Sequence, residues 1–97
     1  MKSLAEIKKI LKDLKPELKE RYSVKEIGIF GSVVRNEQKK GSDIDIAVEF
    51  DIIPDLFKFI NLETFLEKKL GTKVDLVRKE AIRKELRENI LNEVVAV

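Results

Sequence analysis

The chain has 97 residues, of which 43% are hydrophobic and 39% are charged, and its formal net charge is only +2. This length and composition predict one folded domain over residues 1–97, and the absence of a long apolar run or a signal-peptide core leads us to expect a cytoplasmic protein with no membrane partner. Because the sequence contains no Cys and no His, disulfides, zinc sites with thiolate or imidazole ligands and Ser-His-Asp triads are excluded.

The segment from Ser3 to Leu18 is predicted to be helical. Ser3 and Glu6 have the spacing of a capping box, in which each residue binds a free backbone N–H of the other. Apolar residues then recur at helical spacing as far as Leu18. Pro16 interrupts this pattern, so either a first helix ends before it and a second begins there, or a single helix bends at the proline.

Two strands are predicted around a polar loop. Residues 24–30 form a short apolar run, which ends at Gly31 and Ser32, and Ser32 can cap a brief helical turn. Residues 36–42 are polar and predict a loop. Residues 43–50 alternate strictly between polar and apolar side chains, which is typical of a strand with one buried face.

The second half of the chain predicts two helices around a third strand. Residues 55–70 should form a helix that ends at Gly71, residues 74–77 a strand, and residues 80–92 a helix. Residues 94–97 are either a fourth strand or the frayed end of that helix. The apolar stripe that we expect to face the core in the first of these helices comprises Leu56, Phe59, Ile60, Leu66 and Leu70. Strands separated by helices predict an α/β (α+β) fold, with a small mixed sheet of three to four strands backed by helices.

Three aspartates on the predicted strands are the candidate catalytic and metal-binding residues. Asp43 and Asp45 are two positions apart, so on a strand they point to the same face with Cα atoms roughly 7 Å apart. If the third strand lies beside theirs, Asp75 joins that face. Three neighbouring carboxylates repel one another, and a cation removes this cost. The alternative is a solvated face of a half-buried strand, but aspartate is depleted in strands, and we therefore favour the metal site.

The type of metal and its ligand follow from the available side chains. With only oxygen ligands, the site suits Mg²⁺ or Mn²⁺, and carboxylates at this spacing can share two ions. Gly31 and Ser32 can present backbone N–H groups and a hydroxyl to a phosphate, although they could equally form only a turn and a cap. Arg35 and Ser42 are further candidates for nucleotide contacts, with a solvated side chain and a turn residue as the respective alternatives. We therefore expect a nucleoside triphosphate as substrate.

Together these motifs resemble the nucleotidyltransferase superfamily of the DNA polymerase β type, and most closely its minimal nucleotidyltransferase (MNT) domains. The residues that carry the resemblance are Ile29-Phe30-Gly31-Ser32 with Arg35, Ser42-Asp43-Ile44-Asp45, Val74-Asp75-Leu76-Val77, and the closing Ile90-Leu91 and Glu93-Val94. It implies triphosphate binding at Gly31 and Ser32, two metals held by Asp43 and Asp45, and a third carboxylate, Asp75, that favours deprotonation of the attacking hydroxyl. Many members have glycine after the motif arginine, where this chain has Asn36, a residue that tolerates positive φ.

The resemblance also implies a function. It predicts metal-dependent transfer of a nucleoside monophosphate, AMP from ATP, onto an acceptor hydroxyl, with two Mg²⁺ or Mn²⁺ ions. Because MNT domains are often paired with HEPN ribonuclease toxins, it predicts an antitoxin that modifies a tyrosine of such a partner. Two alternatives remain open: a non-catalytic binding module that neutralises its partner by occlusion, and a nucleotidyltransferase that acts on RNA ends or small molecules.

Overall fold

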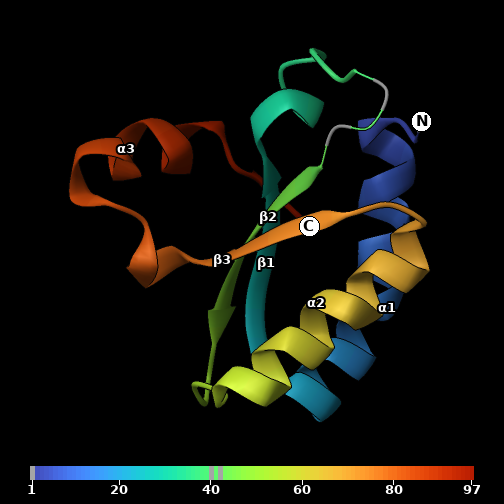
Figure 1. Ribbon diagram of the computed structural model, residues 1–97, viewed down its shortest axis with the longest axis vertical. Coiled ribbons are helices and arrows are strands. Elements are labelled where there is room, and N and C mark those ends of the chain that lie inside the picture. Colours follow the sequence, from blue (N-terminus) through green and yellow to red (C-terminus); the bar gives the residue numbers. More distant parts are fainter. Residues whose placement is uncertain (1, 40, 42) are drawn as a thin grey trace.

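A computed structural model describes residues 2–39, 41 and 43–97 and contains one four-stranded mixed sheet with helices packed on it (Figure 1). The elements in chain order are α1 (Leu4–Tyr22), β1 (Val24–Phe30), the 3₁₀ helix η1 (Gly31–Val33), β2 (Ile44–Phe50), α2 (Leu56–Leu70), β3 (Val74–Arg78), the 3₁₀ helix η2 (Lys79–Ala81), α3 (Lys84–Glu93) and β4 (Val95–Ala96). The strand order is β3-β2-β1-β4, in which β2 and β3 are parallel and the other two pairs are antiparallel. The predicted fold class is confirmed.

Helix α1 settles the ambiguity at Pro16, because one helix runs through it. The predicted capping box is present, with Glu6 N–H donating to Ser3 Oγ and Ser3 N–H donating to Glu6 Oε1, both at 3.2 Å. A proline inside a helix costs about 3 kcal/mol. The fully buried Leu11 and Leu18 lie on either side of Pro16, and their burial offsets this cost.

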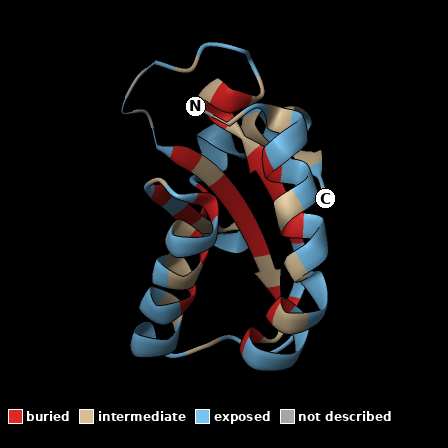
Figure 2. Ribbon diagram, turned by 90° about the vertical axis from the view of Figure 1, so that its right-hand side faces the viewer, coloured by how far each residue is buried: buried red, intermediate tan, exposed pale blue. Residues whose placement is uncertain are grey.

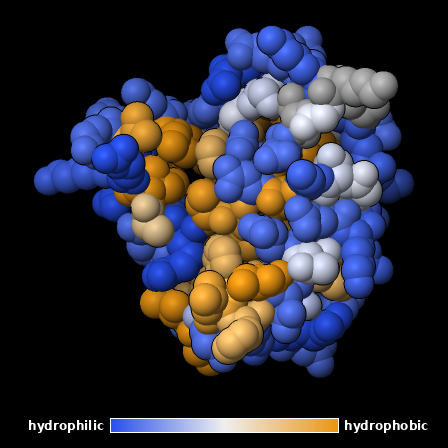
Figure 3. All heavy atoms as spheres, in the orientation of Figure 1, coloured by the Kyte–Doolittle hydropathy of each residue, from blue (hydrophilic) through white to orange (hydrophobic). Residues whose placement is uncertain are grey.

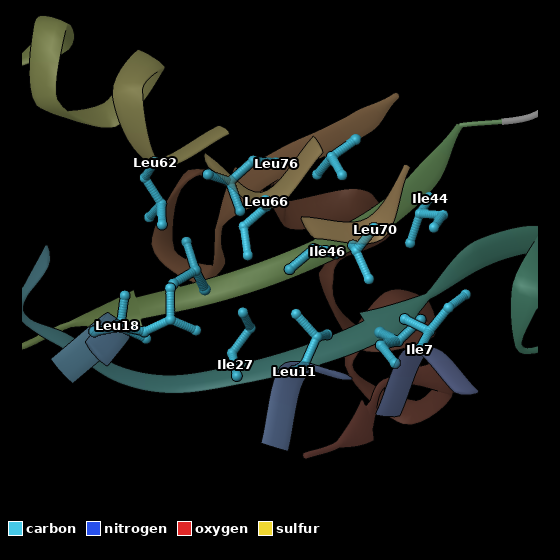
Figure 4. Packing of buried hydrophobic residues seen from close by; sticks show 14 of the residues in the cluster. Ile7, Leu11, Leu18, Ile27, Ile44, Ile46, Leu62, Leu66, Leu70 and Leu76 are labelled. Carbon is cyan, nitrogen blue, oxygen red and sulfur yellow. The ribbon is translucent and has the colours of Figure 1, made fainter. Parts of the chain in front are cut away.

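Helices α1 and α2 cover one face of the sheet, and the hydrophobic core lies between these helices and the sheet (Figure 4). Ile44, Ile46, Val48 and Phe50 of β2 are all buried, as the alternation over residues 43–50 predicts. Seen from the helix side, buried positions line the strand between the two helices, while the outer sides of the helices are exposed (Figure 2). Helix α3 lies apart from α1 and α2, across the sheet (Figure 1). Within the described ranges, every helix is too short or too polar to serve as a membrane span.

The predicted core stripe of α2 is partly wrong. Leu66 and Leu70 are buried and Phe59 packs against the core, but Leu56 and Ile60 are 68% and 48% exposed. The buried face is centred near Leu62 and Leu66. At 3.6 residues per turn, Leu56 and Ile60 lie roughly 120–160° from Leu62 around the helix axis. The first turns of α2 are therefore apolar on both faces, and periodicity alone did not identify the inner one.

The C-terminal region differs from the predicted helix over residues 80–92. Residues 79–81 form η2, Ile82 is extended and buried, and α3 begins only at Lys84. The Arg87 guanidinium donates to the carbonyl oxygens of Glu80 and Ile82, both at 3.2 Å, which satisfies backbone acceptors that precede α3. Of the two alternatives for residues 94–97, the fourth strand is correct, because β4 pairs with β1.

Candidate active site

Asp45 and Asp75 face each other across two neighbouring parallel strands. The register of β2 and β3 pairs Asp45 directly with Asp75. Their neighbours Ile44, Ile46 and Leu76 are buried in the core. Since side chains alternate along a strand, the two aspartates point to the opposite face of the sheet, away from α1 and α2. The expected carboxylate cluster required these two strands to be adjacent, and they are.

Gly31 brings the backbone against the Asp45 carboxyl group. Its φ of +78° lies in the left-handed region, which other residues rarely adopt. A Cβ atom at this position would overlap the Asp45 carboxylate, and even its Cγ atom would be only 2.9 Å away. Position 31 therefore requires glycine for two reasons: the positive φ of the turn, and the close approach of the backbone to Asp45.

The loop that follows Gly31 is held by its own backbone. The N–H groups of Val34 and Arg35 donate to the Gly31 carbonyl oxygen at 3.0 and 3.2 Å, and Glu37 N–H donates to the Ser32 carbonyl at 2.8 Å. Asn36 closes the turn with a φ of 58°, the conformation that asparagine tolerates. Ser32 is half-buried within this loop, beside the strand ends that carry the aspartates.

Arg35 lies at the end of this loop and binds two carboxylates. Its Nη1 donates to Glu93 Oε1 at 2.5 Å, and its Nε donates to Glu37 Oε2 at 3.1 Å. Sequence reasoning had included Arg35 among the candidates but gave Glu93 no role in the site. The contact joins residues 58 positions apart, and the resemblance had included Glu93 only as part of the closing stretch of the chain.

The carboxyl group of Asp45 has an unusual electrostatic environment. Its pKa is raised from 3.8 to about 6, chiefly by burial and then by the negative charges of Asp75 and Asp43 and a hydrogen bond with Asp75, while the charge of Arg35 acts in the opposite direction. Perturbed acids of this kind are frequent in functional sites. Asp43 thus acts on Asp45 through its charge, whereas Ser42, the remaining predicted nucleotide contact, lies outside the described residues.

The donor chemistry of this site fits a hard divalent cation. Among residues 2–39, 41 and 43–97, no three acidic side chains already stand close enough to enclose a metal ion. Mg²⁺ rarely uses such a cage, because it is usually bound through one or two carboxylates together with substrate phosphates. The repulsion between Asp45 and Asp75 is relieved either by a proton or by a cation, and both are compatible with the raised pKa of Asp45.

Comparison with known proteins relates nearly the whole chain to one family. Residues 7–97 match the family described as nucleotidyltransferase domain. The chain is 52% identical over 97 residues to the protein adenylyltransferase MntA of Thermococcus cleftensis, covering 100% of this chain and 98% of that protein. A solved structure assigned as a minimal nucleotidyltransferase has a TM-score of 0.75 at 31% identity, covering 96% of this chain and 90% of that one. A chain from a toxin–antitoxin structure with AMP-PNP has a TM-score of 0.73 at 28% identity, covering 93% of this chain and 70% of that one.

Replacement of Asp45 by asparagine is expected to stabilise the protein at neutral pH. Because the pKa of Asp45 is about 6 in the folded chain and 3.8 ordinarily, the unfolded chain loses this proton first as the pH rises. The free energy of unfolding should therefore fall between about pH 4 and pH 6, by about 1 kcal/mol after allowance for solvent screening. Denaturant titrations of wild type and Asp45→Asn at several pH values, with chelator present, measure this difference.

The matched control is Asp51→Asn, at an exposed position just after the same strand. This variant should keep the wild-type fall in stability between pH 4 and pH 6. An identical pH dependence in wild type and Asp45→Asn would show that Asp45 has no raised pKa in the folded protein.

Proposed function

This chain belongs to the nucleotidyltransferase family, and on that premise we propose that it transfers AMP from ATP to a hydroxyl group of a partner protein. The observation that carries the proposal is the pairing of Asp45 with Asp75 beside the Gly31 turn. Nucleotidyl transfer needs a cation site and a phosphate site within reach of each other, and this corner of the sheet offers both. The identity to the adenylyltransferase MntA supports AMP as the transferred group.

Each residue of the site has a role in the proposed reaction. Asp43 and Asp45, with Asp75, would hold two Mg²⁺ ions, or Mn²⁺ in their place. When bound, the ions would supply positive charge that stabilises the attacking and leaving oxygens of an in-line displacement. The acceptor oxygen attacks the α-phosphorus and pyrophosphate leaves, while Asp75, which is exposed, draws the proton from the acceptor hydroxyl.

The phosphates are assigned to the loop after β1. Ser32 and the backbone N–H groups next to Gly31 bind the β- and γ-phosphates, since N–H groups at such a turn form an anion-binding concavity. Arg35 contributes the positive charge of its guanidinium group. Ser42 completes the nucleotide contacts in this proposal, and its assignment rests on the sequence pattern alone.

The surface of the molecule supports a protein partner. Five side chains of the β2–α2 connection and the first turns of α2 are 48–79% exposed, and we call them the α2 apolar surface: Ile52, Ile53, Leu56, Phe57 and Ile60. Hydrophobic atoms gather at the start of α2 and again over α3 in Figure 3, where Leu86 and Leu91 are also exposed. Monomeric proteins rarely expose contiguous apolar patches of this kind, and such patches mark interaction sites.

We assign the partner to the HEPN class of toxins and the acceptor to a tyrosine of that partner, so that the chain acts as an antitoxin in the cytoplasm. The toxin–antitoxin relationship of the structural neighbour with AMP-PNP supports a toxin partner, and the sequence resemblance to MNT domains indicates the HEPN class. A module that neutralised its partner only by occlusion would gain nothing from two repelling carboxylates, which lower stability without metal. The catalytic function is therefore the better supported one.

The proposed reaction predicts that Asp45→Asn reduces the rate of AMP transfer about 100-fold or more, because the variant loses a charged metal ligand. The chain would be incubated with labelled ATP, Mg²⁺ and a HEPN-type partner protein, and mass spectrometry would identify the modified residue. Asp51→Asn serves as the control and should transfer AMP at the wild-type rate. Full activity of Asp45→Asn would contradict the assignment, and nucleotide binding without any covalent AMP would favour the non-catalytic antitoxin.

The α2 apolar surface makes a separate prediction about the partner. Phe57→Lys should weaken the complex with the HEPN-type protein at least about tenfold, because aromatic anchors dominate many interfaces. Phe57 is 79% exposed, so the folded chain should tolerate the change. Calorimetry would compare this variant with Lys68→Ala, an exposed position near the other end of α2 that should bind normally. An unchanged dissociation constant for Phe57→Lys would place the interface elsewhere.

A further inference from the structure

Glu93 links the end of α3 to the loop beside the paired aspartates. Its Oε1 accepts a hydrogen bond from Arg35 Nη1 at 2.5 Å, and its side chain is only 19% exposed. Arg35 ends the loop that begins at Gly31, whose backbone lies against the Asp45 carboxyl group. A chain of direct contacts therefore runs from the C-terminal segment to the centre of the site.

The position of Glu93 is fixed by the backbone that follows it. Strand β4 pairs with β1, and Val97 N–H donates to the Ile27 carbonyl oxygen at 3.1 Å. Lys15 Nζ donates to the Val97 carbonyl oxygen at 2.8 Å, which ties the same segment to α1. Gly28 allows this close approach, because a Cβ atom there would overlap the Val94 side chain. The backbone at Glu93 is thus held by contacts that do not involve Arg35.

The two carboxylates on Arg35 differ in their surroundings. Glu37 binds Nε at 3.1 Å, but its side chain is 63% exposed, and ion pairs in such positions contribute little. Glu93 is largely withdrawn from water, where a charge-assisted hydrogen bond is stronger. The two bonds use one N–H of Nε and one of Nη1, and a guanidinium has five N–H donors in a rigid fork. Donors therefore remain for an anion while Glu93 holds the group.

We propose that Glu93 is a positioning residue for nucleotide binding, which holds the Arg35 guanidinium and the loop from Gly31 to Arg35 in the arrangement that receives the triphosphate. The proposal rests on the proposed function for the identity of the anion. Without Glu93, the guanidinium can turn toward Asp45. The two groups already interact, because the positive charge of Arg35 partly counteracts the rise in the pKa of Asp45. Arg35 would then neutralise the carboxylate on which cation binding depends, and the phosphates would lose a fixed positive charge.

The first test separates binding from chemistry. Glu93→Gln should raise the KM for magnesium ATP roughly fivefold, the change that corresponds to the loss of about 1 kcal/mol, and leave kcat within about twofold. Glu37→Gln is the matched control, with the same substitution on the same arginine at an exposed position, and should keep both constants near wild type. An unchanged KM in Glu93→Gln, or a loss confined to kcat, would overturn the positioning role.

The second test does not depend on catalysis. Hydrogen exchange of the Val34, Arg35 and Glu37 amides, which are bonded within the loop, should be faster in Glu93→Gln and unchanged in Glu37→Gln. The charge-swapped variant with Arg35→Glu and Glu93→Arg should recover slow exchange by restoring the ion pair. It should still bind magnesium ATP weakly, because the positive charge at position 35 is lost.

These measurements distinguish the two proposals when one of them fails. If the wild-type chain neither binds ATP nor transfers AMP, the proposed function is wrong, and amide exchange alone decides the role of Glu93. Faster exchange in Glu93→Gln that the charge swap reverses would then support Glu93 as the residue that holds the loop. Equal exchange in wild type and Glu93→Gln would overturn it, whatever the activity.

Discussion

The parallel pairing of β2 with β3 is the constraint on which the candidate site depends. It sets the half-buried Asp45 opposite the exposed Asp75, so that the two carboxylates repel each other and Asp45 retains its proton to about pH 6. Burial of the other face of these strands against α1 and α2 fixes the register, because a shift by one residue would turn the aspartates into the core. The packing that stabilises the fold therefore also maintains the unfavourable carboxylate pair.

The surroundings of this pair are built from contacts that are distant in sequence. Gly31 brings backbone against Asp45, and Arg35 at the end of the same loop is bound by Glu93 from the C-terminal end of α3. Strand β4 and the close approach at Gly28 hold that end in place. A domain of this size has few layers with which to support a site, and here the last residues of the chain supply much of the support for the loop.

Sequence reasoning reached the fold class and placed Asp45 and Asp75 on strands because both follow from local patterns. The alternation over residues 43–50 decided which side of β2 is buried, and Gly71 correctly marked the end of α2. Local periodicity could not decide between the two apolar faces at the start of α2, so Ile60 was placed in the core. It also could not find Glu93, because the contact that gives this residue its importance exists only after β4 has joined the sheet.

The most direct test is the titration of the Asp45 carboxyl group, monitored by carbon-13 NMR of the labelled protein. In the free protein its pKa should be about 6. With Mg²⁺ and AMP-PNP present, the pKa should fall well below that value, because bound cations favour the ionised carboxylate. A pKa near 3.8 in the free protein, or a raised pKa that Mg²⁺ and nucleotide leave unchanged, would contradict the claim that the paired aspartates form a cation and nucleotide site.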